Sequence, residues 1–77
     1  MLTRDAMRAQ IAATIHEDPS EIGDDDNLMD LGLDSIRAMQ LLTRWNETGL
    51  GLDFPEFAER LTLNAWWTIV ERHQAGP

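Results

Sequence analysis

The sequence predicts an all-α fold, a four-helix bundle with a long first loop and a short third helix. Apolar residues recur at helical spacing in separate segments, and capping or helix-breaking residues bound each segment. The chain has 77 residues and no cysteine, so helix packing alone has to build its small core. We therefore expect a single domain over 1–77, with its ordered core in about 3–73.

The first helix is expected over residues 3–17. Its apolar positions recur every four residues, at Met7, Ile11 and Ile15. Thr3 is suited to cap the helix, and Asp18-Pro19 is suited to stop it.

Residues 18–34 have no helical period and carry seven acids without a base. A disordered linker would lack apolar anchors, whereas this segment has four of them, at Ile22, Leu28, Leu31 and Leu33. We expect an ordered loop that is pinned to the core.

The second helix should begin near Ser35 and end near Glu47 or Thr48, where Gly49 and Gly51 follow. A helical wheel places one apolar stripe toward the core, made of Ala38, Leu41, Leu42 and Trp45. Asn46 opens a glycosylation sequon, but no secretory signal accompanies it.

A short third helix is expected over 54–60, with Pro55 in its first turn and Phe57 in the core. Thr62 should cap the last helix. The apolar stripe of that helix is predicted to be Leu63, Trp66, Trp67 and Val70, although neighbouring Trp66 and Trp67 cannot both point fully inward. Residues 75–77 are expected to fray.

The charge is one-sided, with 14 acids against 6 bases and a net charge of −8. Such a field repels nucleic acid and anionic membranes and favours basic protein surfaces. The sequence has no run of 18 apolar residues, and its lack of cysteine fits a reducing compartment, so we expect a cytoplasmic protein.

Ser35 can be interpreted as a helix N-cap or as the residue that follows an Asp34 cap. A catalytic serine needs a base, and the only histidines, His16 and His73, fall at the ends of the first and last helices. Self-sufficient nucleophilic catalysis is therefore not expected. The acidic loop also fails the alternation of an EF-hand from Asp24 onward, so we expect no metal site.

Two apolar side chains flank Ser35 but fall outside the buried stripe of the second helix. Met39 lies about 110° from the centre of the stripe, and Ile36 lies nearly opposite it. This arrangement indicates a docking surface for a partner protein. The alternative for Ile36 is that it packs beneath the preceding loop.

The segment Asp30-Leu31-Gly32-Leu33-Asp34-Ser35 resembles the D-x-G-x-D-S motif of phosphopantetheine-dependent carrier proteins of nonribosomal peptide, polyketide and fatty acid synthesis. The greatest similarity is to the aryl carrier domains of siderophore synthesis, including those fused to isochorismatase. It is carried by the segments 32–37 (GLDSIR), 44–45 (RW), 53–54 (DF) and 64–67 (NAWW). Ala38 and Leu61 depart from that subgroup, where a larger Met and a Pro are expected.

The resemblance implies a non-catalytic phosphoprotein that holds 4′-phosphopantetheine on Ser35, with Asp34 assisting attachment. The arm would carry salicylate or 2,3-dihydroxybenzoate as a thioester. The implied partners are a phosphopantetheinyl transferase, an aryl-acid adenylating ligase and a condensation or cyclization domain, and the isolated domain is expected to be monomeric. The implied partner-binding residues are Met39, Ile36, Phe54 and Ala58.

Three points stay open at this stage. Phe54 could belong to the core instead of the docking surface. The cargo could be an amino acid or a polyketide acyl group. The chain could also be an acidic helical interaction module without any prosthetic group.

Overall fold

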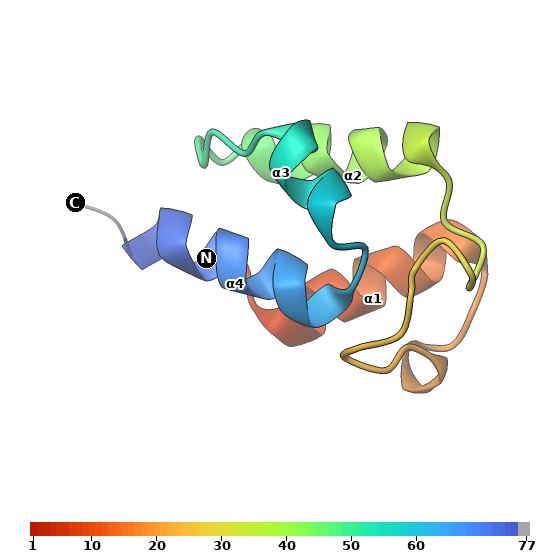
Figure 1. Cartoon of the computed structure of the whole chain (residues 1–77). Coiled ribbons are helices and arrows are strands. Elements are labelled where there is room, and N and C mark those ends of the chain that lie inside the picture. The colour runs from red at the N-terminus through yellow and green to blue at the C-terminus, as the bar shows by residue number, and fades with distance from the viewer. Residues whose placement is uncertain (76–77) are drawn as a thin grey trace.

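The computed structural model describes residues 1–75 and shows an all-helical chain. Figure 1 shows α1 (Arg4–Ile15) lying along α4 (Leu63–Ala75), with α2 (Ser35–Asn46) on the other side of the bundle and the short α3 (Phe54–Glu59) packed on α4. A long loop joins α1 to α2. The predicted bundle with a long first loop and a short third helix is confirmed.

Helix α1 begins at its predicted cap, because the Thr3 hydroxyl accepts a hydrogen bond from the Ala6 N–H at 3.1 Å. It ends two residues earlier than predicted. His16 adopts a left-handed conformation with φ 60°, and the Glu17 N–H donates to the Ala12 carbonyl at 2.9 Å. This Schellman motif ends the helix before Asp18-Pro19 can do so.

The loop over 18–34 is ordered and pinned to the bundle, as predicted. It contains one unpredicted 3₁₀ turn, η1 (Pro19–Glu21), which the Asp18 side chain caps. The hydrogen bond from the Ser20 backbone N–H lowers the pKa of the Asp18 carboxyl. Three of the four apolar anchors are buried and Leu31 is partly buried.

Polar contacts fasten this loop to two helices. The Arg8 guanidinium of α1 donates to the Ile22 carbonyl and to Asp24, both at 2.6 Å. The Leu28 N–H donates to the Leu61 carbonyl at 2.7 Å. The Asn64 N–H, at the start of α4, donates to the Asp24 carbonyl at 2.8 Å. The loop is therefore held between α1 and α4.

The core is centred on three aromatic rings, those of Trp45, Phe57 and Trp66, whose centroids lie 5.1–6.3 Å apart. Both indole N–H groups find acceptors: Trp45 donates to the Gln10 side chain at 2.8 Å, and Trp66 donates to the Phe57 carbonyl at 2.9 Å. The predicted α2 stripe is buried as expected. These bonds allow two polar indoles to lie inside a small core.

The α4 stripe differs from the prediction at one position. Trp66 is buried, whereas Trp67 is only partly buried and packs against the rim of the core. Ile69 takes the buried position instead, because it lies three residues after Trp66 on the same face. Thr62 caps the helix as predicted, accepting from the Ala65 N–H at 3.1 Å. Ala75 is helical, and the rest of the predicted frayed end, 76–77, lies outside the described residues.

The connection from α2 to α3 depends on the side chain of Asn46. Its Nδ2 donates to the Leu52 carbonyl at 2.9 Å, and its Oδ1 accepts from the Leu52 N–H at 2.6 Å. Between them, Gly49 and Gly51 have φ of 87° and 71°, a region that other residues seldom adopt. The helix thus ends at Asn46, and this amide closes the turn that leads to Phe54.

The two chain ends are paired in a similar way. The Leu2 N–H donates to the Gln74 side chain at 2.6 Å, and the Gln74 amide donates back to the Leu2 carbonyl at 2.9 Å. Figure 1 shows that α1 begins and α4 ends at the end of the bundle opposite the start of α2. Among residues 1–75, no helix combines the length and apolar character needed to cross a membrane.

Candidate functional site

Ser35 lies at the first helical position of α2, and its neighbour Asp34 is the cap. The Asp34 carboxylate accepts a hydrogen bond from the Arg37 N–H at 2.8 Å, and its carbonyl accepts from the Ala38 N–H at 2.9 Å. Of the two interpretations of Ser35, the second is confirmed: Asp34 is the cap, and Ser35 is the residue that follows it. Ser35 is exposed and its hydroxyl is not needed to close the helix.

The turn before Ser35 is held in place from below. Leu33 is buried, and its N–H donates to the Leu28 carbonyl at 3.1 Å. Gly32 has φ 115°, a backbone conformation that residues other than glycine rarely adopt. An anchored turn therefore holds the exposed Ser35 at a fixed place, as is required of a residue that another enzyme has to modify.

The chemistry of this position suits a phosphodiester. A helix N-terminus carries a partial positive charge and unsatisfied N–H groups, and these favour an anion on the first residue. Ser35 is exposed, and a serine hydroxyl is an oxygen to which a phosphate group can be attached. The residues present therefore fit a prosthetic group attached through phosphate, and Asp34 lies next to it with its side chain 61% exposed.

Within the described residues, neither histidine is hydrogen-bonded to Ser35. His73 is engaged elsewhere: its Nδ1 lies 3.1 Å from the Leu50 carbonyl, and its Nε2 lies 3.8 Å from Glu56. His16 follows α1 and so shares the Ser35 end of the bundle, which sequence reasoning did not foresee (Figure 1). Among residues 1–75, however, no hydrogen bond joins His16 to Ser35 or to a carboxylate. A triad is therefore not assembled.

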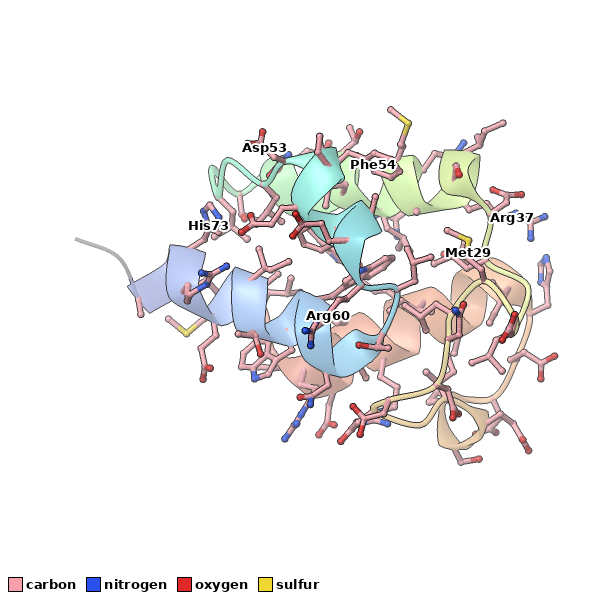
Figure 2. The ribbon with its side chains drawn as sticks, in the orientation of Figure 1. Met29, Arg37, Asp53, Phe54, Arg60 and His73 are labelled. Carbon is pink, nitrogen blue, oxygen red and sulfur yellow. The ribbon has the colours of Figure 1, made fainter. Side chains whose placement is uncertain are left out.

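The predicted partner-binding residues differ in exposure. Ile36 is 70% exposed and Met39 is 52% exposed, so the alternative that Ile36 packs beneath the loop is wrong. Ala58 is exposed on α3. Phe54, labelled in Figure 2 at the start of α3, is only partly buried and packs against the core. Phe54 thus belongs partly to the core and partly to the surface.

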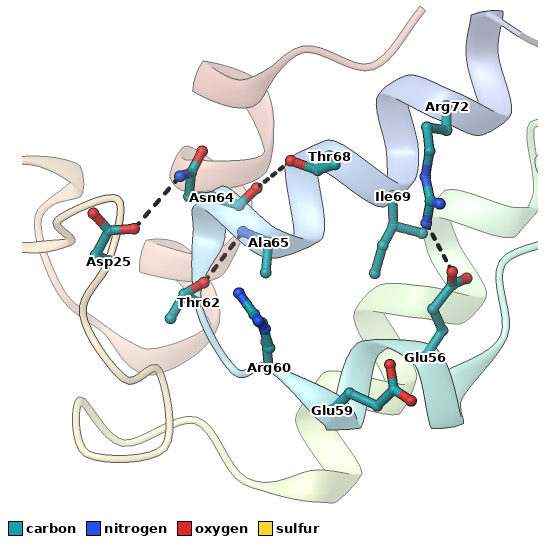
Figure 3. Close-up of a pocket in the computed structure, with 10 residues that line it drawn as sticks. All are labelled: Asp25, Glu56, Glu59, Arg60, Thr62, Asn64, Ala65, Thr68, Ile69 and Arg72. Atoms are coloured by element: carbon teal, nitrogen blue, oxygen red, sulfur yellow. Dashed lines mark hydrogen bonds and ion pairs between the residues drawn. The ribbon is translucent and has the colours of Figure 1, made fainter.

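A hollow of about 310 Å³ lies between α3 and α4, away from Ser35 (Figure 3). An ion pair between Arg72 and Glu56, 2.9 Å apart, crosses part of it. None of the predicted site residues lines it. In the described part of the chain, no group of three or more His, Cys, Asp or Glu residues could hold a metal ion.

Sequence reasoning missed the role of Asn46, which it noted only as part of a sequon. The structure shows the Asn46 amide fixing the start of α3 and thereby the place of Phe54. An available signal was an amide residue in the last turn of a helix, followed by the two glycines of the connection.

Comparison with known proteins agrees with this geometry. Residues 5–68 match the family described as "Phosphopantetheine attachment site". The acyl carrier protein ScoB of Streptomyces coeruleorubidus is 37% identical over 75 residues, covering 97% of this chain and 88% of that protein. No solved structure matches the chain at a significant level.

Two further relatives are much longer than this chain. The isochorismatase of Bacillus subtilis is 41% identical over 70 residues, and enterobactin synthase component B of Escherichia coli is 40% identical over 63 residues. These matches cover 91% and 82% of this chain but only 22% of each relative. The chain therefore belongs to the phosphopantetheine attachment family and is a non-catalytic carrier domain, of the kind that bears a 4′-phosphopantetheine prosthetic group.

Proposed function

We propose that Ser35 is the residue that accepts the prosthetic arm. The proposal rests on the observation that Ser35 is exposed at the start of α2 and that Asp34, not Ser35, caps the helix. In the transfer, the Ser35 oxygen forms a bond to the phosphorus that bears the pantetheine, and the pyrophosphate bond of coenzyme A breaks. The hydroxyl proton passes to a base of the transferase, and the nucleotide leaves. The bound arm then supplies a thiol on which an acyl group is held as a thioester.

Asp34 assists this attachment in two ways. Its carboxylate holds the first turn of α2 in place through the Arg37 N–H. Its side chain is also 61% exposed, and a carboxylate beside the reacting oxygen can help to place the magnesium ion that accompanies coenzyme A in the transferase.

The test is attachment of the arm in cells. Coexpression with a promiscuous phosphopantetheinyl transferase should add the mass of one arm to the intact protein, and Ser35→Ala should abolish this addition. Ser20→Ala is the matched control, because Ser20 is the only other serine and lies in the exposed η1 turn. An unmodified wild-type protein would refute the proposal and favour an acidic interaction module without a prosthetic group.

We further propose that the cargo is an aryl acid of the salicylate or 2,3-dihydroxybenzoate type. The support is the similarity to isochorismatase and enterobactin synthase component B, and to pyochelin synthetase PchE of Pseudomonas aeruginosa, which is 42% identical over 70 residues. An adenylating ligase would load the acid and a condensation or cyclization domain would remove it. The armed protein should accept benzoate-type acids from a panel of adenylating ligases, as read by intact mass.

A second candidate is a carrier whose cargo is another acyl group. The similarity to the acyl carrier protein ScoB over 88% of that protein's length favours it. In the same panel, loading by amino acid or other acyl ligases, with no benzoate-type acid accepted, would support this candidate against the aryl one.

The docking surface is proposed to comprise Met39, Ile36, Phe54 and Ala58. Its support is the exposure of two large apolar side chains on the same helix as Ser35. Met39→Asp should weaken loading by the ligase while still allowing attachment of the arm. Ala13→Asp, which adds the same charge at an exposed position of α1, is the control and should leave both steps unchanged.

A further inference from the structure

The charge of the molecule is divided in an unexpected way. The chain carries a net charge of −8, yet α2 contains two arginines and no acid, so its net charge is +2 and that of the rest is −10. Both arginines, Arg37 and Arg44, are exposed. The helix that bears Ser35 is thus the most basic helix of a strongly acidic domain.

Arg37 occupies a position in its helix that is electrostatically unfavourable for a cation. It occupies the third position of α2, where the partial positive charge of the helix N-terminus disfavours a cation. Its contact with Asp34 is loose, with 3.9 Å between the guanidinium and the carboxylate, and the two side chains are 44% and 61% exposed. Such a pair contributes little to stability. Figure 2 shows Arg37 directed away from the bundle. Its position is therefore not explained by the stability of the fold.

Arg44 lies seven residues further along the same face, about 10 Å away along the axis. Among residues 1–75, Arg44 has no carboxylate within ion-pair distance, whereas three other arginines are paired, namely Arg4, Arg8 and Arg72. Arg44 also lines a small hollow between α1 and α2, together with Gln40 and Thr14. Arg37 and Arg44 form what we call the arginine stripe.

The arginine stripe lies on a different flank of α2 from the serine. At 100° per residue, Met39 is about 40° from Ser35 around the axis, whereas both arginines are about 160–180° from it. The exposed Ile36 lies between the two flanks. A partner that needs only the Ser35 hydroxyl can bind at the start of α2 without covering both arginines. A partner that meets the far end of a long arm can lie across the whole exposed face of α2.

We propose that the arginine stripe docks a carboxylate-bearing surface of the adenylating ligase, the enzyme that loads the acyl group onto the arm. The inference rests on the proposed function and names the chemistry of one partner. The argument for this partner is charge complementarity. Exposed guanidinium groups without a firm partner can bind carboxylates of another protein. Opposite charges at the rim of an interface raise the association rate. The net charge of the whole domain indicates partners with basic surfaces, whereas α2 is predicted to contact an acidic one.

The experiment compares loading of the armed protein by the adenylating ligase that loads the wild type best. Arg37→Glu and Arg44→Glu are made singly and together. The double variant should lower kcat/KM for thioester formation about tenfold at low salt, and the deficit should shrink as salt screens the new repulsion. Arg37→Glu should not lower the melting temperature, because it places an acid in the first turn of α2.

Arg60→Glu is the matched control. Arg60 is exposed and has no ion pair among residues 1–75. It does not belong to α2, since it lines the hollow between α3 and α4 (Figure 3). The control should load within about twofold of the wild type. Attachment of the arm by the transferase should also be unchanged in all variants, as read by intact mass.

The outcomes separate this inference from the proposed function. If the wild type takes up the arm and is loaded, but the double variant is loaded equally well, the inference fails and the carrier function stands. An equal loss with Arg60→Glu would show a general charge effect, and slower arm attachment would assign the stripe to the transferase; both overturn the inference. A wild type that takes no arm, or that no ligase loads once armed, overturns the proposed function as well.

Discussion

The amide of Asn46 offers a sharp test of how the carrier positions α3. In Asn46→Asp, an oxygen replaces the Nδ2 group that donates to the Leu52 carbonyl at 2.9 Å. The shape of the side chain is retained, and Oδ1 can still accept from the Leu52 N–H at 2.6 Å. The change thus removes one donor and places a carboxylate oxygen against a carbonyl oxygen in a partly buried turn.

The expected cost is about 2 kcal/mol. A hydrogen bond of this kind contributes about 0.5–1.5 kcal/mol, and a carbonyl left without its partner adds about 1–3 kcal/mol when buried, less when partly exposed as here. For a domain of this size, about 2 kcal/mol corresponds to a melting temperature lowered by roughly 8–16 °C. Urea unfolding followed by circular dichroism would measure the free energy of unfolding directly.

The cost should also depend on pH with a definite sign. The Leu52 N–H can donate to either form of the introduced carboxyl, whereas the Leu52 carbonyl repels the ionised form and accepts from the protonated one. We therefore expect the pKa of this carboxyl in the folded state to be raised above the unfolded value of about 3.9. Stability is then fully present below the unfolded pKa, where the protonated carboxyl can donate to that carbonyl, and is lost as pH rises through the folded pKa. The variant should therefore approach the wild type below about pH 4.

Gln40→Glu is the control, because it makes the same amide-to-carboxyl change at an exposed position of α2. It should change the free energy of unfolding by less than about 0.5 kcal/mol. If both variants lost stability equally, or if Asn46→Asp showed no recovery at low pH relative to the control, the role assigned to the Asn46 amide would be refuted.

Three further outcomes are expected from urea unfolding. Asp34→Ala should cost about 0.5–2 kcal/mol because it removes the α2 cap, whereas Ser35→Ala should cost less than about 0.5 kcal/mol; the reverse order would show that Ser35 is the cap. His16→Gly should stabilise the protein by about 0.5–1 kcal/mol by relieving the left-handed conformation that ends α1, and a loss would contradict the Schellman assignment. Trp66→Phe should cost about 2–4 kcal/mol, since it opens a cavity and leaves the Phe57 carbonyl without its donor; a near-neutral result would show that the indole bond is unimportant.

Much of the fold could be predicted because the local signals agree with one another. The α2 stripe followed from helical spacing, and Thr3 and Thr62 were recognisable caps. The end of α1 could not be predicted, because nothing in the residue type of His16 announces a left-handed conformation. Trp67 was misplaced because a wheel gives directions but not the position of the neighbouring helix that decides which flank is covered.

The candidate site was predictable at Ser35 but less so around it. The choice between Ser35 and Asp34 as cap needed the hydrogen bond from the Arg37 N–H, which sequence spacing allows for either residue. The dual character of Phe54 and the Asn46 amide depend on contacts across a turn that contains two left-handed glycines. Such contacts are set by backbone geometry, and the residue pattern alone does not encode them.

The reciprocal pairing of Leu2 with Gln74 has a practical consequence for how the domain can be handled. Both residues lie at the pole opposite Ser35, in a molecule whose longest dimension is 34 Å. A dye, a surface linker or a fusion joined at either residue would therefore leave the serine pole turned toward solution. The same closeness would let a short peptide join the two ends, so that new termini could be opened at the Gly49–Gly51 turn.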